Sequence, residues 1–318
     1  MIRFVPRCAC VCALLALAAL SGCEDVIAEL GKQQADGKSN ATASMSPRSD
    51  GTIRIATFNI QVFGTSKLEK SNVVNVLAQV VRQFDVVAIQ EIRSKDDSVL
   101  SQFVAKVNAD GGRYDFVVGP RLGRTSSKEQ YAYIYDTQRI ELDADGVWTV
   151  PDPDDRLHRE PFVARFRTHG QDSSRAFTCT LINIHTDPDE TDAELDALDD
   201  VFRAVQRSSP PEDDVILLGD LNVDDRHLGQ LGRVANAGWV ITGQATNTRG
   251  NKSYDNIVFD RRATVEYTGS FGVLDLQQEF GLSLEEALEV SDHRPVWAAF
   301  NATEGAVGEL AGDGGTLR

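Results

Sequence analysis

Apolar residues along the chain follow two spacings, one typical of strands and one typical of helices. Continuous apolar runs such as Val86–Ile89 predict strands that are covered on both faces. Segments 71–84, 99–107 and 191–205 instead carry apolar residues three and four positions apart, which predicts amphipathic helices. The expected strands are Ile53–Asn59, Val86–Ile89, Tyr114–Val118, Tyr131–Tyr135, Phe162–Phe166, Phe177–Ile184, Val215–Leu218, Ile257–Phe259, Val265–Thr268 and Pro295–Phe300.

Two helices have polar residues at their predicted starts. Ser71 is expected to cap the first helix, and Thr191 with Glu194 has the spacing of a capping box. Strands and helices interleave without an internal linker, which predicts one α/β (α+β) domain. Two packed sheets with helices outside would account for the pattern, but periodicity alone does not distinguish this from a single doubly wound sheet.

The first residues have the features of an export signal. Arg3 and Arg7 precede a short apolar stretch, Val11 to Leu20, which is short for a membrane span. It ends in Leu20-Ser21-Gly22-Cys23, which resembles the lipobox of bacterial lipoproteins. We therefore expect cleavage before Cys23, lipidation of Cys23, and a lipid-anchored protein on the periplasmic or extracellular face of a bacterial cell envelope. The alternative is an ordinary secretory signal with a chance cysteine.

The expected organisation is a lipoprotein signal peptide over 1–22, a flexible tether over 23–50, one domain over 51–301 and a disordered tail over 302–318. Of the five cysteines, only Cys179 falls within the expected domain. It lies in an apolar run and has no thiol partner there, so it is expected to be a buried core thiol.

The acidic composition restricts how the protein could bind a phosphate-containing substrate. The formal net charge is −16, which argues against passive binding of nucleic acid through bulk charge. A phosphate substrate would need local cations or a bound metal.

Polar residues that can bind metal or move protons lie at the ends of several expected strands. They are Asn59, Glu91, His185, Asp220, Asn222, Asp255, Asp292 and His293. Oxygen ligands of this kind suit Mg²⁺, Mn²⁺ or Ca²⁺ better than Zn²⁺. Any one of them alone is more simply explained as a turn cap or a structural histidine, so the case rests on the group.

Short sequence motifs around these residues resemble those of the endonuclease/exonuclease/phosphatase superfamily, and within it those of the pancreatic-type deoxyribonucleases. The motifs are Thr57-Phe58-Asn59-Ile60, Gln90-Glu91-Ile92-Arg93, Lys128-Glu129-Gln130-Tyr131, Arg159-Glu160-Pro161-Phe162, Ile184-His185, Gly219-Asp220-Leu221-Asn222, Tyr254-Asp255 and Ser291-Asp292-His293. They occur in the family's order. The resemblance implies a four-layer αββα sandwich of two packed mixed β-sheets flanked by helices, with the site at one edge.

The resemblance also implies roles for individual residues. Glu91 would be the main metal ligand, helped by Asn59 and Asp292, while Asp220 and Asn222 would hold a second cation or orient the attacking water. Glu129 would orient His185, and Asp255 would orient His293. Two histidines held in this way can supply a base and an acid near neutral pH. The residues expected to contact substrate are Arg93, Arg159 and Tyr131.

Three positions depart from the pancreatic pattern. Gln61 replaces an arginine, Ser127 replaces a tyrosine that contacts the DNA minor groove, and Asp225 replaces a cysteine of a structural disulfide. These changes affect how the enzyme would grip a duplex and whether calcium would stabilise its loops, and they leave the catalytic set intact.

The sequence thus predicts a monomeric, divalent-metal-dependent phosphodiesterase, specifically a deoxyribonuclease-like endonuclease using Mg²⁺ or Mn²⁺, with Ca²⁺ as a further candidate. DNA is the expected substrate and RNA remains open. Two alternatives are an enzyme acting on lipid headgroups or small phosphate esters, and a non-catalytic surface-binding module.

Overall fold

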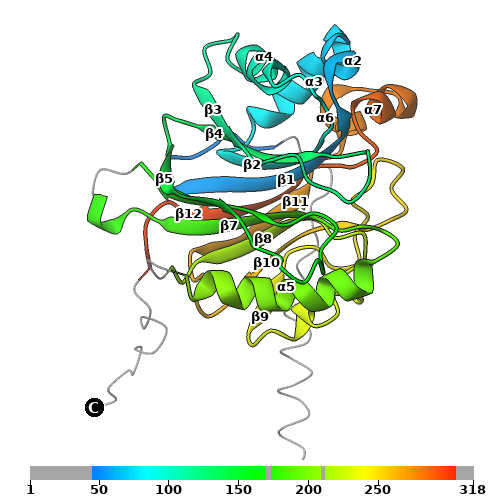
Figure 1. The fold of residues 1–318 in the computed structure, drawn as a ribbon. Coiled ribbons are helices and arrows are strands. Elements are labelled where there is room, and N and C mark those ends of the chain that lie inside the picture. The colour runs from blue at the N-terminus through cyan, green and yellow to red at the C-terminus, as the bar shows by residue number, and fades with distance from the viewer. Residues whose placement is uncertain (1–44, 170–172, 209–211, 306–318) are drawn as a thin grey trace, which may run out of the picture. The chain divides into compact units, whose positions relative to one another are not determined.

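The computed structural model describes residues 45–169, 173–208 and 212–305. The expected signal peptide, Cys23 and most of the tether and tail lie outside these residues. In the described part of the chain the strands form two six-stranded mixed sheets, shown edge-on in Figure 1. The first sheet has the order β11-β12-β1-β2-β4-β3 and the second has the order β5-β6-β7-β8-β10-β9.

The strands of the first sheet are β1 (Thr52–Phe63), β2 (Val86–Ile92), β3 (Tyr114–Val118), β4 (Gln130–Asp136), β11 (Tyr267–Val273) and β12 (Val296–Asn301). Those of the second are β5 (Ile140–Thr149), β6 (Phe162–Thr168), β7 (Thr178–His185), β8 (Val215–Asp220), β9 (Ala237–Trp239) and β10 (Asp255–Asp260). The helices are α2 (Thr65–Leu68), α3 (Ser71–Val81), α4 (Ser98–Val107), α5 (Thr191–Gln206), α6 (Leu276–Phe280) and α7 (Leu284–Val290). Single 3₁₀ turns lie at Ser173–Arg175 and Leu231–Arg233.

Three apolar clusters define four layers. Alternate residues of β1 point to opposite faces, so Phe58 packs against α3 and α4 while Ile55 packs against the second sheet. A third cluster lies between the second sheet and α5. Figure 1 accordingly shows α5 on one outer face and the other helices on the opposite face. The expected αββα sandwich is confirmed, and the single doubly wound sheet is wrong.

Some local expectations were wrong. Ser71 is the first residue of α3 and makes no cap. Thr191 is likewise the first residue of α5, whose N-cap residue Glu190 makes no side-chain cap, and the Glu194 carboxylate accepts from the backbone N–H groups of His158 and Asp187. The one capping box in the described helices is at α7, between Ser283 and Glu286. The last hairpin begins later than expected, with β11 at Tyr267.

Strands β5 and β9 were not predicted. Each is an edge strand with partly exposed side chains, and β5 carries a bulge around its acidic centre, so neither shows a buried apolar run. Cys179 is buried and free, as expected.

Contacts of the folded part extend beyond the expected bounds 51–301 at both ends. Arg48 pairs with Asp85 and Asp136, and Glu304 accepts a hydrogen bond from the backbone N–H of Thr178. Across residues 45–169, 173–208 and 212–305, no helix is long and apolar enough to span a membrane.

Candidate active site

The predicted polar residues meet at one end of the two sheets. Asn59 of β1 donates its side-chain amide to Glu91 Oε1 at 3.2 Å and to Asp220 Oδ2 at 3.0 Å. Glu91 lies near the end of β2 in the first sheet, and Asp220 is the last residue of β8 in the second. One amide therefore connects the two sheets at this point.

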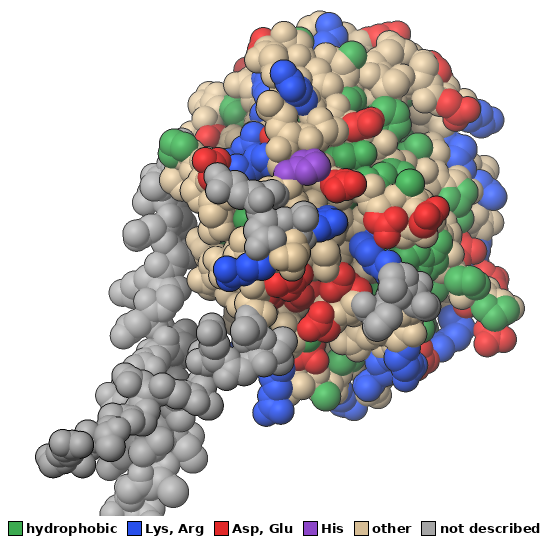
Figure 2. All heavy atoms as spheres, turned by 90° about the vertical axis from the view of Figure 1, so that its left-hand side faces the viewer, with side chains coloured by type: hydrophobic (Ala, Val, Ile, Leu, Met, Phe, Trp, Pro, Cys, Tyr) green, Lys and Arg blue, Asp and Glu red, His purple; other side chains and the backbone are tan. Residues whose placement is uncertain are grey.

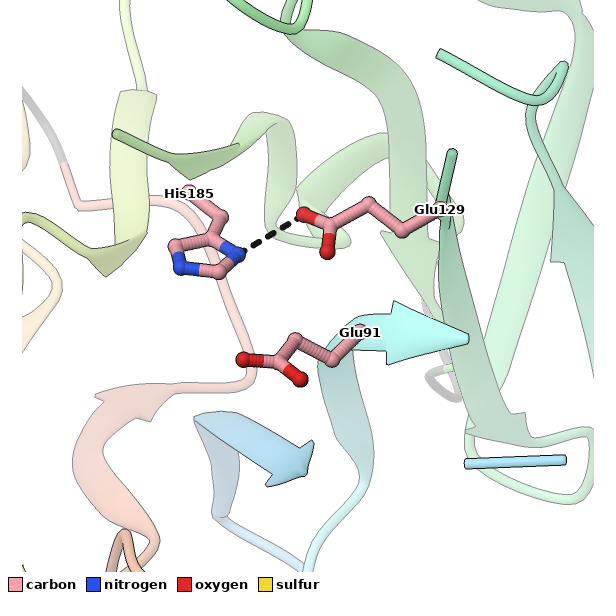
Figure 3. A group of neighbouring side chains, drawn as sticks. All are labelled: Glu91, Glu129 and His185. Carbon is pink, nitrogen blue, oxygen red and sulfur yellow. Dashed lines mark hydrogen bonds and ion pairs between the residues drawn. The ribbon is translucent and has the colours of Figure 1, made fainter. Parts of the chain in front are cut away.

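The first histidine is fixed by a carboxylate of the opposite sheet. Nδ1 of His185, the last residue of β7, lies 2.7 Å from Oε1 of Glu129, which directly precedes β4 (Figure 3). Burial alone would raise the pKa of Glu129, but ion pairs with His185, Arg159 and Arg93 outweigh it and lower that pKa to about 2. Burial opposes the charge on His185, yet Asp220 and Glu129 raise its pKa overall. The Glu129 carboxylate is therefore charged and directs the His185 ring.

The second histidine forms a matching pair. Nδ1 of His293, which precedes β12, lies 2.9 Å from Oδ2 of Asp255, the first residue of β10. The Thr246 hydroxyl donates to the same Asp255 oxygen at 2.6 Å. Burial works against protonation, but Asp255 and Asp220 raise the pKa of His293 to about 10. This pair also joins the two sheets.

Asp220 lies between the two histidines. Its Oδ2 atom is 3.5 Å from Nε2 of His185 and 3.5 Å from Nε2 of His293. Because a carboxylate holds Nδ1 of each ring, the two Nε2 atoms face the shared space. They are the ring nitrogens free to exchange protons with a bound molecule.

The backbone at Glu91 is strained. Its φ angle is 63°, which is uncommon for a residue with a side chain, and the pairing of β2 with both neighbours shifts register around it. The Glu91 Oε2 atom accepts a hydrogen bond from the backbone N–H of Val62 at 2.8 Å. The bulge thus turns this carboxylate out of the sheet and towards Asn59, an arrangement typical of functional sites.

The donor set fits a hard divalent cation. Carboxylate oxygens of Glu91 and Glu129 and a ring nitrogen of His185 lie within 4.8 Å of one another (Figure 3), as do ligand atoms of Asp220, Asp255 and His293. Among the described residues no lysine or arginine pairs with Asp220, and its ionic partners are the rings of His185 and His293.

The other expected ligands lie near this centre. The backbone N–H of Asn222 donates to Asp220 Oδ1, and its side-chain amide donates to the Thr186 carbonyl oxygen. Asp292 is partly buried, and its charge acts on His293 and on Lys67. Asn59 presents N–H groups to the carboxylates here, while its oxygen accepts from the Gln61 backbone N–H, so its role as a ligand stays a prediction.

A buried polar network lies directly below the site, between the sheets. The Gln90 amide donates to Thr57 Oγ1 at 2.9 Å and to Asn183 Oδ1 at 2.7 Å, and Asn183 donates to the carbonyl oxygens of Ile89 and Ala132. Such a network fixes the register of one sheet on the other because its buried groups need these partners.

Tyr131 was expected to contact substrate, and this expectation was wrong. The residue is 1% exposed, and its hydroxyl accepts from the backbone N–H of His185 at 2.9 Å. Burial between the sheets leaves its ring no face towards a substrate. Tyr131 instead positions the backbone that carries His185.

The two predicted arginines hold the carboxylates. Arg159 is buried and bonds to Glu129 and to the carbonyl oxygens of His185 and Thr186. Arg93 is partly exposed and bridges Glu91 Oε2 at 3.3 Å and Glu129 Oε2 at 3.2 Å. Contacts of either arginine with a substrate phosphate stay predictions.

One positively charged residue beside the site, Lys67, was not identified from the sequence. The Lys67 ammonium donates to the carbonyl oxygens of Ile60, Gln61 and Val290, and burial, partly offset by Asp292 and Glu91, lowers its pKa to about 8. Lys67 lies in a short helix that no sequence motif marks, so only the fold brings it here.

Comparison with known proteins agrees with this geometry. The model of the Endonuclease/Exonuclease/phosphatase family matches residues 56–293. Deoxyribonuclease-1-like 2 of Mus musculus is 33% identical over 78% of this chain and 91% of its own length. Deoxyribonuclease-1 of Bos taurus is 31% identical over 77% of this chain and 91% of its own. The crystal structure of D. rerio TDP2 complexed with a single-strand DNA product has a similar fold, with a TM-score of 0.53, 17% identity, and coverage of 79% of this chain and 99% of that one.

Proposed function

Because this chain belongs to the Endonuclease/Exonuclease/phosphatase family and is a metal-dependent hydrolase of phosphodiester bonds, we propose that it is an endonuclease whose substrate is DNA. The observation that carries the proposal is the pair of histidines whose Nε2 atoms both face Asp220 Oδ2 at 3.5 Å. A group that removes one proton and a group that donates another are what hydrolysis of a phosphodiester requires.

The histidines divide that work between them. One Nε2 atom accepts the proton of the attacking water, and the other donates a proton to the leaving oxygen, so that one P–O bond forms and one breaks. Glu129 and Asp255 hold the Nδ1 atoms and stabilise the protonated rings. Such proton transfers each contribute roughly 10²–10⁴-fold to the rate.

Glu91 and Asp220 are the residues we propose to hold the catalytic cation, with Asn222, Asp292 and Asn59 around them. When bound, a divalent cation supplies positive charge for the phosphate in the transition state. We propose Mg²⁺ or Mn²⁺ as this ion, because the donors are carboxylate and amide oxygens.

A cavity next to the catalytic residues supports a polymeric substrate. It has a volume of about 650 Å³ and lies between residues 222–227 and residues 250–254. Arg226 and Lys252 line it together with Asp224 and Asp225, so two basic side chains are available to phosphate although the charges of the lining cancel. Asp225, at the position of the family's cysteine, accepts a hydrogen bond from the Gly243 N–H at 3.0 Å and so links the first of these loops to a third lining segment, residues 243–245. We propose that the nucleic-acid strand extends from the histidines into this cavity.

The decisive experiment compares substrates and metals. Purified protein is incubated with supercoiled plasmid, single-stranded DNA, RNA or sphingomyelin, in Mg²⁺, Mn²⁺, Ca²⁺ or excess EDTA. We expect relaxed and then linear plasmid in Mg²⁺ or Mn²⁺ and no cleavage in EDTA. Undiminished cleavage in EDTA would contradict metal dependence, and hydrolysis of sphingomyelin without DNA cleavage would reject the substrate. His185→Ala is the control for contaminating nucleases.

We further propose that the enzyme acts as a monomer tethered to a bacterial cell envelope through a lipid on Cys23. The support is the Leu20-Ser21-Gly22-Cys23 sequence, followed by a polar stretch long enough to hold the domain away from the membrane.

A further inference from the structure

A second group of carboxylates lies at the far end of the sandwich. Strand β8 ends at the catalytic Asp220, and Asp214 directly precedes its first residue. Six residues of extended chain span about 20 Å, so the two carboxylates mark opposite ends of the sheet. Glu266, just before β11, and Glu304, just after β12, join Asp214 there. The group therefore takes residues from both sheets.

The three side chains converge. One carboxylate oxygen of each lies within 4.8 Å of an oxygen of both others. Asp214 and Glu266 are each 1% exposed, and Glu304 is partly buried. Donors that bind one Ca²⁺ at about 2.3–2.6 Å lie at most about 5 Å apart, so this spacing suits a single ion.

The inner oxygens have no partner. Asp214 Oδ1 and Glu266 Oε2 are buried without a hydrogen bond. The Thr264 hydroxyl is a neutral neighbour that lowers the pKa of Asp214 and cannot neutralise its charge. The opposite oxygens are held in place. Glu266 Oε1 accepts from the Gly305 N–H at 2.6 Å, and Glu304 Oε1 accepts from the Thr178 N–H at 2.7 Å. Hydrogen bonds thus fix two of the carboxylates and leave oxygens facing one another.

The negative charges of these three carboxylates are not neutralised by any basic side chain of the described residues. Within the described residues no lysine, arginine or histidine forms an ion pair with Asp214, Glu266 or Glu304. Burial, reinforced by Glu266, raises the pKa of Asp214 to about 9, and burial with Glu266 and Glu212 raises that of Glu304 to about 7. Buried like charges are costly unless a cation or protons neutralise them.

We propose that Asp214, Glu266 and Glu304 bind a structural divalent cation, Ca²⁺ in preference to Mg²⁺, at a site separate from the catalytic centre. The donors are oxygens alone, and they come from three irregular segments, which suits the variable coordination of Ca²⁺ better than the strict octahedron of Mg²⁺. The ion ties the C-terminal segment to the start of β8. Figure 2 faces the side of the molecule that lies on the left in Figure 1, and both acidic and basic side chains are visible on its lower half.

The test measures binding and stability of the full chain. Calcium binding by equilibrium dialysis and thermal unfolding by circular dichroism are compared for wild type, Glu266→Gln, Glu304→Gln and the catalytic-site variant Asp220→Asn. Asp220→Asn should lose plasmid cleavage yet keep one bound Ca²⁺ and the calcium-dependent rise in Tm. Glu266→Gln and Glu304→Gln should each bind one Ca²⁺ fewer than wild type and lose that rise, while their cleavage in Mg²⁺ stays within about twofold of wild type.

Two results would overturn the proposal. One is a rise in Tm with Ca²⁺ that is equal in wild type and in both glutamine variants, because the carboxylates would then be neutralised by protons or hydrated. The other is loss of all calcium binding in Asp220→Asn. Neither readout depends on the nature of the substrate, so the proposed nuclease activity can fail without affecting this test.

Discussion

Nδ1 of His185 lies 2.7 Å from Oε1 of Glu129, and the two residues belong to different sheets. His185 ends β7 of the second sheet, whereas Glu129 precedes β4 of the first. In the second pair the two sheets exchange roles. His293 precedes β12 of the first sheet, and Asp255 is the first residue of β10 in the second. Each histidine ring is therefore held by a carboxylate from the other side of the sandwich.

The paired arrangement predicts strongly non-additive mutations. His185→Ala should lower the cleavage rate by at least roughly 10²-fold. Adding Glu129→Ala should cost little more, since the carboxylate then has no ring to orient. His293 and Asp255 should behave in the same way. Plasmid cleavage rates of the four single and two double variants measure this, and penalties that multiply within a pair would contradict it.

We expect the ionised carboxylate of Glu129 to stabilise the folded protein at neutral pH and to lose this effect in acid. Its pKa is lowered to about 2 in the folded protein from 4.5, so the contribution is complete above about pH 4.5 and is lost as the pH falls through 2. The shift corresponds to about 3 kcal/mol at neutral pH. Glu129→Gln should therefore be less stable by about this amount at pH 7, with the difference shrinking towards zero in acid.

Urea unfolding in EDTA between pH 3 and pH 7 tests this prediction. Asp145→Asn, at an exposed position of β5, is the matched control and should show no such trend. A difference between Glu129→Gln and wild type that does not change with pH would rule out the explanation by ionisation.

Gly219 should tolerate no side chain. A Cβ atom there would lie 1.9 Å from the carbonyl oxygen of Ile184 on the neighbouring parallel strand β7. Gly219→Ala should therefore separate β7 from β8, which carry His185 and Asp220, and abolish both activity and cooperative unfolding. Gly243→Ala is the control, because Gly243 has a φ of 62° but open space around it and should cost only about 1–2 kcal/mol. Circular dichroism melts of the two variants decide the matter.

The lipid anchor can be tested independently of catalysis. Wild type produced in a bacterial host should partition into the detergent phase, and Cys23→Ser should move to the aqueous phase with its nuclease activity intact. A wild type that already partitions into water would refute the anchor.

The sequence indicated which polar residues would meet at the candidate site, because the family resemblance rests on short motifs at strand ends. Residues whose positions depend on both sheets were less visible. Tyr131 belongs to the same motif as Glu129, yet its environment is the interior between the sheets. The contact of Gln90 with Asn183 joins residues far apart in the chain, and no periodicity indicates it.

The acidic group at the opposite end of the sandwich was likewise not predicted from the sequence. Asp214, Glu266 and Glu304 each stand next to a strand, where an acidic residue is usually a solvated turn residue. Only the packing of β8 against the hairpin of β11 and β12 makes them neighbours. Charge and burial, which define that site, are properties of the folded chain.

The division of the site between two sheets also governs when the enzyme becomes active. Strand β12 pairs with β1, so the first sheet stays incomplete until the segment that carries β12 has left the ribosome. His293 reaches Asp255 and Asp220 only at that stage. A chain that ends before this segment holds His185 and Glu129 but lacks His293, and with it the second of the two groups that would transfer protons.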